Sequence, residues 1–214
     1  MSVVAKIISE LKVASGNKEF SKMTLGAATY GAGDEILGVP VPAIRAIHKK
    51  YKAQIGFAEI KKLLYSPIHE VRFLALAAMN DFFGKDAVVF YLRALSDGKI
   101  NNWDLVDLSA PGIIGRRCFE NGDLAIMREL AAPGKSLWQN RVAMVAVLHF
   151  IRSGRPEIVF EFVRVLANHP HHLIHKAMGW MLREAWKKIP AEVEKFLLNN
   201  SLPKTTIRYA KELM

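Results

Sequence analysis

Trp103 and Asp107 are the residues of this chain whose types and spacing best fit a chemical task. They stand four positions apart in the run Asn101-Asn-Trp-Asp-Leu-Val-Asp107. Positions i and i+4 share one face of a helix, so an indole and a carboxylate are expected side by side. An aromatic face and an anion can both stabilise positive charge. In a chain with a formal net charge of +10, which attracts polyanions, this pair indicates chemistry on DNA.

The composition fits one globular protein with a continuous core, since 51% of the 214 residues are hydrophobic and 23% are charged. We therefore expect a single domain over residues 1–214. The positive charge favours phosphate backbones, acidic membranes or acidic proteins as partners, and nucleic acid is the commonest of these.

Location is predicted from what the sequence lacks. The start has no export-signal pattern, no apolar run is long enough for a bilayer span, and the single cysteine, Cys118, cannot form an internal disulfide. We expect a cytoplasmic, nucleoid-associated bacterial protein without a membrane partner.

Helical periodicity dominates the chain, and no strand alternation stands out. One example has apolar residues at spacings of three, four, seven and eleven from the first, at Val71, Leu74, Ala75, Ala78 and Phe82. Glycine and proline residues, among them Gly98, Pro111 and Pro133-Gly134, separate short helical runs. Many short helices with short links predict stacked antiparallel helix pairs.

An internal repeat supports this interpretation. The segment that begins at Glu70 resembles the segment that begins at Asn140, which aligns Arg72 with Arg141. Steps of 35, 34 and 35 residues lead from Arg72 through Asp107 and Arg141 to Lys176. A period near 35 is typical of helix-pair repeats, which run to about 34–47 residues. Equivalent positions of a solenoid line one surface, so Asp107, Arg141 and Lys176 are expected in a row. The alternative is that they only cap or bridge neighbouring repeats.

Two longer motifs resemble the AlkD-type DNA alkylation repair glycosylases, in that family's order. They are Asn102-Trp-Asp-Leu-Val-Asp-Leu-Ser-Ala-Pro and His175-Lys-Ala-Met-Gly-Trp-Met-Leu-Arg-Glu. Shorter matches, including Tyr30-Gly-Ala-Gly-Asp and Trp138-Gln-Asn-Arg, extend the resemblance from about Tyr30 to the C-terminus. The resemblance implies an all-α, HEAT-like helical-repeat solenoid with a basic concave face. It also implies hydrolytic removal of N3- and N7-alkylated purines from duplex DNA, which begins base excision repair. We expect no cofactor, no metal, no obligatory protein partner and a monomeric enzyme.

Carried over residue by residue, the resemblance makes Asp107 the catalytic carboxylate, with Trp103 and Trp180 packing against the deoxyribose of the lesion. The residues expected to contact DNA are Arg141, Arg45, Arg183, Lys176 and Tyr30. Lys176 rests on its place in the repeat and is equally a plain surface lysine. Tyr30 rests on its glycine-rich loop and equally packs locally. Asn140, and Lys204-Thr-Thr-Ile near the C-terminus, depart from the family's usual residues, which affects binding strength and lesion preference.

Other interpretations stay open. The same fold can serve as a catalytically silent module that binds DNA or senses damage, or as a scaffold for an acidic protein. His171 and His175 share a helix face, as in some zinc sites, although solvated histidines are the commoner case. Cys118 stands near Arg116 and Arg117, which lower a thiol pKa, but a structural cysteine is the commoner case.

Overall fold

The computed structural model describes residues 1–26, 31, 33–82 and 84–213. Its regular elements are helices, and within these ranges strand pairing is limited to one isolated parallel bridge between Glu35 and Ile68. The predicted all-α, helical-repeat class is therefore confirmed. No helix in the same ranges is both long and apolar enough to cross a bilayer.

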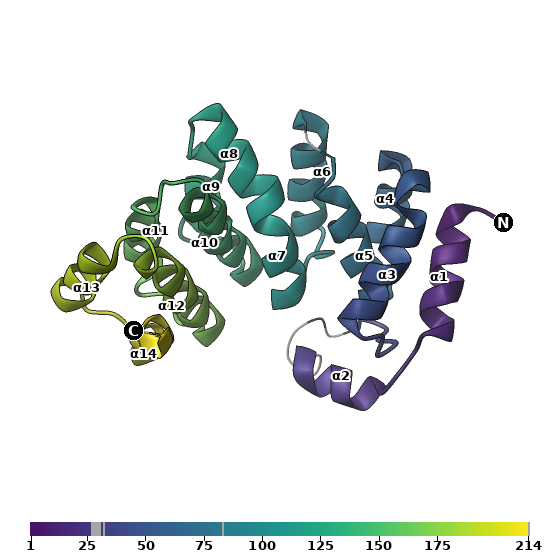
Figure 1. Cartoon of the computed structure of the whole chain (residues 1–214), viewed down its shortest axis with the longest axis horizontal. Coiled ribbons are helices and arrows are strands. Elements are labelled where there is room, and N and C mark those ends of the chain that lie inside the picture. Colours follow the sequence, from purple (N-terminus) through teal and green to yellow (C-terminus); the bar gives the residue numbers. More distant parts are fainter. Residues whose placement is uncertain (27–30, 32, 83, 214) are drawn as a thin grey trace. The chain divides into compact units, whose positions relative to one another are not determined.

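The chain divides into two compact units, Met1–Ser109 and Ala110–Met214, which we describe separately (Figure 1). The helices of unit 1 are α1 (Val3–Val13), α2 (Lys18–Leu25), α3 (Val41–Tyr51), η1 (Lys52–Gln54), α4 (Phe57–Leu64), α5 (His69–Met79), α6 (Lys85–Ser96) and α7 (Trp103–Ala110). The helices of unit 2 are η2 (Pro111–Gly115), α8 (Arg116–Asn121), α9 (Ala125–Ala131), α10 (Leu137–Arg152), α11 (Ile158–Leu166), α12 (His172–Trp186), α13 (Pro190–Asn199), α14 (Lys204–Ala210) and η3 (Lys211–Leu213). A single domain over residues 1–214 and a basic concave face stay predictions.

Unit 1 is organised around α5, which packs against α3 and α4, while α1 packs on all three of these helices (Figure 1). The apolar residues of the predicted periodicity that fall on α5 are buried, and these are Val71, Leu74, Ala75 and Ala78. The helix ends at Met79, so Phe82, the last residue of the periodic pattern, lies beyond it. The Phe82 ring instead packs against Phe57 of α4, with ring centroids 6.3 Å apart.

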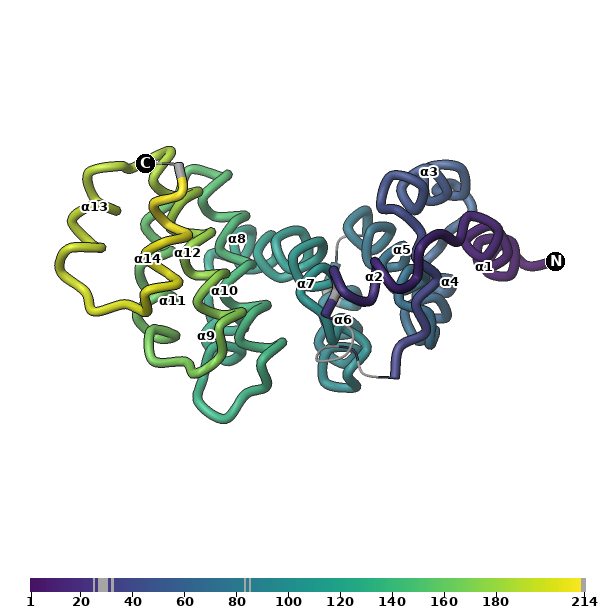
Figure 2. Tube along the Cα trace, turned by 90° about the horizontal axis from the view of Figure 1, so that it is seen from below, coloured from purple at the N-terminus to yellow at the C-terminus, as the bar shows by residue number. Residues whose placement is uncertain are grey.

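Unit 2 is organised around α10, which packs against α9, α11 and α12; Figure 2 shows α10 and α12 side by side. A reciprocal cap starts α10, because the Gln139 backbone N–H donates to Ser136 Oγ and the Ser136 N–H donates to Gln139 Oε1. Nearly every following residue of α10 is buried. This central helix leaves one face of α12 free to pack against α13 and α14.

The α-helix α7 ends at Ala110, as expected from the break at Pro111, but the chain stays helical beyond Pro111. Pro111 opens η2, a turn of wider π-helix that links α7 directly to α8. Proline has no N–H to continue the α-helical ladder, and a local widening of the helix accommodates that loss. Gly115 at the end of η2 packs directly against the Ala146 carbonyl oxygen of α10, where a Cβ would not fit.

Candidate functional site

α7 carries Trp103 and Asp107 one turn apart, and both side chains are partly exposed. Directly before the helix, the Oδ1 of buried Asn102 accepts the Trp103 backbone N–H at 2.8 Å. Asp104 places a negative charge in the first turn, where the helix dipole favours it. An indole and a carboxylate are thus presented by a helix whose first turn is fixed by side chains.

A buried polar chain holds α7 against α6. The Tyr91 hydroxyl lies 3.0 Å from Ser109 Oγ, and Ser109 Oγ donates to the Leu105 carbonyl at 2.6 Å. Burial, with a contribution from the Asp107 charge, raises the pKa of Tyr91. Tyr91 therefore stays neutral and can donate a hydrogen bond.

The first turn of α7 is also bonded to the start of α5. His69 Nε2 lies 2.8 Å from Asp104 Oδ2, and Asp104 Oδ1 accepts the Leu105 backbone N–H at 2.8 Å. His69 is buried, with 2% of its surface exposed. Its second ring nitrogen, Nδ1, lies 3.6 Å from Asp34 Oδ2. The imidazole is thus placed between two carboxylates.

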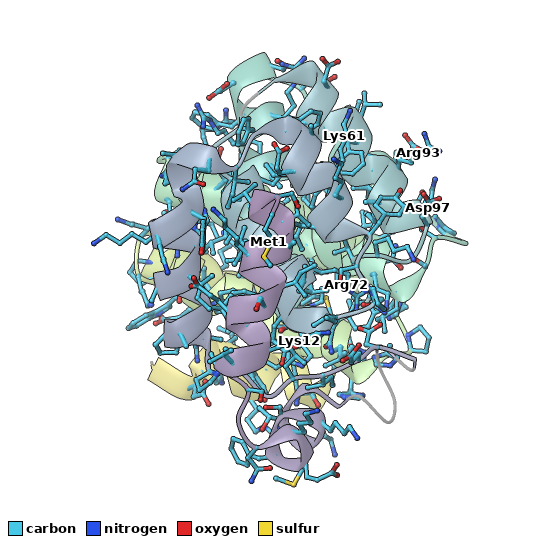
Figure 3. All side chains as sticks on the ribbon, turned by 90° about the vertical axis from the view of Figure 1, so that its right-hand side faces the viewer. Met1, Lys12, Lys61, Arg72, Arg93 and Asp97 are labelled. Carbon is cyan, nitrogen blue, oxygen red and sulfur yellow. The ribbon has the colours of Figure 1, made fainter. Side chains whose placement is uncertain are left out.

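Arg72, one turn after His69 on α5, extends this cluster (Figure 3). Its guanidinium forms an ion pair with Asp34, and Nη1 donates to the Lys99 carbonyl at 3.3 Å and to Asn101 Oδ1 at 3.2 Å. Asn101 Nδ2 in turn donates to Asp34 Oδ1 at 3.2 Å. We call Asp34, His69, Arg72, Asn101 and Asp104 the α5–α7 network. It joins α5 to the segment that leads into α7.

In the α5–α7 network the pKa values of His69 and Asp34 are shifted toward their charged forms. Burial alone would lower the pKa of His69, but its hydrogen bond to Asp104 and the nearby Asp34 carboxylate outweigh burial and raise the pKa to about 9. Burial would raise the pKa of Asp34, but His69, Arg72 and Asn101 together lower it. The two opposite shifts therefore favour a charged His69 beside a charged Asp34 at the base of α7.

In unit 2, α12 carries Trp180 together with two of the residues expected to contact DNA. Lys176 precedes Trp180 by one turn, and its Nζ lies 5.8 Å from the ring centroid of Tyr209 in α14. Arg183 follows by one turn and forms an ion pair with Glu212 of η3. Lys176, Trp180 and Arg183 are each partly exposed. Their spacing places them on one face of the helix.

The remaining predicted DNA contacts differ in exposure. Arg141 is buried, with 5% of its surface exposed, and its Nη1 donates to the Leu173 carbonyl of α12 at 2.6 Å. Arg72, its counterpart in the repeat, is buried too. Both arginines bond to a backbone carbonyl some 30 residues further along the chain, which is the inter-repeat bridging weighed as the alternative. Arg45 is exposed on α3. Tyr30 lies outside the described residues, and the DNA contacts stay predictions.

The histidines at the start of α12 bond to the backbone. His171 Nδ1 accepts the Leu173 N–H at 3.1 Å, and His175 Nε2 lies 2.6 Å from the His169 carbonyl. Burial, followed by neighbouring positive charge, lowers the pKa of His169, His171 and His172. Among the described residues no group of three or more histidine, cysteine or carboxylate side chains is arranged to hold a metal.

Cys118 is a structural residue of α8. Its thiol is buried, and burial raises its pKa to about 11. Arg117 acts in the opposite direction but is the smallest of the contributions. The lowered pKa that the neighbouring arginines would give does not arise, because the loss of hydration outweighs their charge.

The α5–α7 network was missed at the level of sequence, although a usable signal was present. His69 and Asp104 are 35 residues apart, which is the separation of Arg72 and Asp107. The repeat therefore relates two pairs of residues on the same two helices. A step of 35 residues from His69, which precedes Glu70, leads to Asp104. Applying the repeat period to His69 as well as to Arg72 would therefore have indicated that His69 and Asp104 belong together.

Comparison with known proteins agrees with this fold. A solved structure described as a predicted DNA alkylation repair enzyme from Enterococcus faecalis superposes with a TM-score of 0.72 at 18% sequence identity, covering 92% of this chain and 94% of that one. No curated protein matches the chain. The family model described as DNA alkylation repair enzyme matches residues 8–214. Because that match spans nearly the whole sequence, the chain belongs to the DNA alkylation repair enzyme family.

Proposed function

We propose that this member of the DNA alkylation repair enzyme family is a monofunctional DNA glycosylase. Its substrates are cationic N3- and N7-alkylated purines in duplex DNA, of the 3-methyladenine and 7-methylguanine type. The observation that carries the proposal is the pair of partly exposed side chains, Trp103 and Asp107, one turn apart on α7 in a protein of this family.

The chemistry explains why a carboxylate and an indole suffice. An N3- or N7-alkylpurine already carries positive charge, so the base leaves without protonation by a general acid. The barrier lies in the sugar, where positive charge develops on C1′ and the ring oxygen as the glycosidic bond stretches. A fixed anion beside the sugar stabilises that charge. We assign this role to Asp107, which also orients or deprotonates the attacking water.

Aromatic faces support the same step, since they attract a cation by about 0.5–2 kcal/mol, depending on desolvation. We assign this role to Trp103 and to Trp180, each packing against the lesion's deoxyribose. Arg45, Lys176 and Arg183 then contact phosphates, together with Tyr30, which lies outside the described residues. Arg141 combines a phosphate contact with its bond to the Leu173 carbonyl. The enzyme acts as a monomer without cofactor.

The deciding experiment is single-turnover release of 7-methylguanine from a duplex that carries one such lesion. Saturating enzyme removes differences in DNA affinity from the comparison. Asp107→Asn is expected to lower the release rate by about 100-fold or more, the usual cost of removing one preorganised electrostatic contact. Asp97→Asn, at an exposed carboxylate directly after α6, makes the same exchange and is expected to leave the rate unchanged.

Other outcomes separate the alternatives. DNA binding without base release in the wild type would indicate a damage-sensing module. Affinity for acidic peptides that exceeds affinity for duplex DNA would indicate a protein scaffold. Release from 7-methylguanine DNA but also, with equal efficiency, from an ethenoadenine duplex would show that the lesion's positive charge is not the basis of selection.

A further inference from the structure

Three segments of unit 1 meet at the first turn of α7. His69 begins α5, Asp34 lies in the segment before α3, and Asp104 is the second residue of α7. His69 Nε2 lies 2.8 Å from Asp104 Oδ2, and Nδ1 faces Asp34 Oδ2 at 3.6 Å. The two carboxylates expose only 13% and 11% of their side chains, for Asp104 and Asp34 respectively. The imidazole is therefore a fixed link between α5 and α7.

We infer that His69 is a positioning residue for the reaction: through Asp104 it sets the orientation of α7 and hence of Trp103 and Asp107. The inference rests on the proposed glycosylase function. His69 itself touches neither lesion nor sugar in this scheme. It acts through Asp104, which is adjacent to Trp103 in sequence and one turn before Asp107 on the same helix.

His69 can affect the orientation of α7 because of the way the first turn of this helix is bonded. Asp104 is bonded twice, through Oδ2 to His69 and through Oδ1 to the Leu105 backbone N–H. Loss of the His69 bond would free the carboxylate and with it the first turn. Electrostatic catalysis depends on fixed geometry, and a displacement of about 1 Å can cost about 100-fold in rate. A small rotation of α7 would move the indole and the carboxylate together.

His69 also controls the local charge. Without its proton, the Asp104 carboxylate would lose its charged partner one turn from Asp107, and the electrostatic field around Asp107 would change. The groups that face His69 are Asp104 of α7, Asp34 of the preceding segment and Arg72 of α5. Glu70 lies beside them, but its carboxylate accepts the backbone N–H groups of residues 37–39. The raised pKa of His69, about 9, keeps the imidazole charged at neutral pH.

A cavity of about 160 Å³ adjoins His69 and Asp104, and its walls are mostly apolar, including Phe20, Ile44 and Phe73. The space beside the imidazole allows replacements that remove its hydrogen bonds without overpacking. His69→Phe keeps a planar ring but cannot donate. His69→Gln keeps an N–H that can reach Asp104. The two variants therefore separate packing from bonding.

The test measures single-turnover release of 7-methylguanine, the Kd for the same duplex and the Tm of each variant. His69→Phe is expected to lower the release rate at saturation by about 10-fold or more with a Kd change below about 2-fold, and His69→Gln is expected to recover much of the rate. Tyr51→Phe is the matched control, because it removes the hydrogen bond between α3 and Glu10 of α1 and leaves α7 untouched. Its rate is expected to equal that of the wild type.

The indole N–H resonance of Trp103, assigned with Trp103→Phe, provides a second readout that requires no activity. It is expected to shift in His69→Phe and not in Tyr51→Phe. An unshifted resonance overturns the inference, as does a rate in His69→Phe equal to that of the wild type. If the wild type releases no base, the proposed function fails, and the resonance alone decides whether His69 positions α7.

Discussion

α7 and α12, the helices that carry Trp103 and Trp180, are held in their units by different physical means. α7 and the segment before it are tied to α5 by polar and charged groups, with His69 and Arg72 on one side and Asp104 and Asn101 on the other. α12 meets α14 by close backbone approach. A Cβ on Gly179 would lie 2.5 Å from Tyr209 Cβ and 2.6 Å from the Thr206 carbonyl oxygen. The position of α7 in unit 1 therefore depends on charged and polar side chains, whereas the position of α12 in unit 2 depends on the small size of Gly179.

The difference predicts what each helix tolerates. Removing one member of a buried charged group leaves its partner desolvated and unpaired, which costs more than the pair contributes. Small residues at a close contact fail instead when volume is added. Substitutions at the two interfaces should therefore differ in how much they lower the free energy of unfolding and in how that loss depends on pH.

The largest effect is expected for Arg72→Met, which breaks the ion pair with Asp34 in the α5–α7 network. The free energy of unfolding should fall by about 3–5 kcal/mol in urea titrations, the usual cost of leaving a buried charge unpaired. Arg93→Met is the matched control, because Arg93 pairs with Asp97 at 77% exposure (Figure 3). Its effect should stay below about 1 kcal/mol. Equal losses for the two variants would mean that the network contributes no more than a surface pair.

The next effect is the dependence of unit 1 on pH. The folded pKa of His69, about 9, lies above its ordinary value of 6.5, so the associated stability is fully present below pH 6.5 and is lost as pH rises through 9. The shift corresponds to a loss on the order of 3 kcal/mol between these limits. The measurement is the difference between wild type and His69→Phe in urea titrations from pH 6 to 10. Tyr51 and Tyr65, whose pKa values are also raised, are common to both proteins and cancel.

That difference should shrink as pH rises. A difference that stays constant across the range would show that His69 does not change its protonation there. The pH profile thus tests the charge of the network, whereas Arg72→Met tests its pairing.

Gly179→Ala probes the uncharged contact in unit 2. The added methyl group has to displace Tyr209 or the Thr206 backbone, and we expect a loss of about 1–3 kcal/mol that does not vary between pH 6 and 9. Glu184→Ala on the same helix, which removes a surface pair with Lys187, should cost less than about 1 kcal/mol. A neutral or stabilising Gly179→Ala would show that α14 moves away easily and that size does not control this interface.

The sequence predicted where helices occur better than where they end. It also predicted which residues share a helix face better than which distant residues they contact. Apolar spacing located α5, and the four-residue step put Trp103 and Asp107 on one face of α7. The same spacing overran α5 at Phe82, because periodicity does not mark where the chain turns. α7 does end directly before Pro111, as expected, but a π-helical turn follows it and accommodates the missing N–H.

The burial of Arg72 and Arg141 could not be predicted from the sequence, for a different reason. Arg72 bonds to Asp34, 38 residues before it, and such a pairing depends on how distant segments fold together. The repeat showed that Arg72 and Arg141 are equivalent, but equivalence does not say whether a position faces solvent or the next helix. Only the three-dimensional arrangement shows that both bridge to a later carbonyl.

The smallest expected effect concerns Arg183, whose ion pair with Glu212 holds a predicted DNA contact at the surface of unit 2. Glu212 is 56% exposed at its side chain, so Glu212→Gln should change stability by less than about 1 kcal/mol.

If Arg183 contacts phosphate, removing the competing carboxylate should tighten duplex binding by about 2- to 3-fold at low salt. The effect should be smaller at high salt, because screening weakens surface charges. Fluorescence anisotropy at two salt concentrations measures this, with Glu192→Gln at the exposed start of α13 as the control for net charge. Equal tightening in both variants would assign the effect to net charge and remove Arg183 from the DNA contacts. Tightening specific to Glu212→Gln would show that unit 2, which positions α12 by size, tunes its affinity for DNA by a single surface charge.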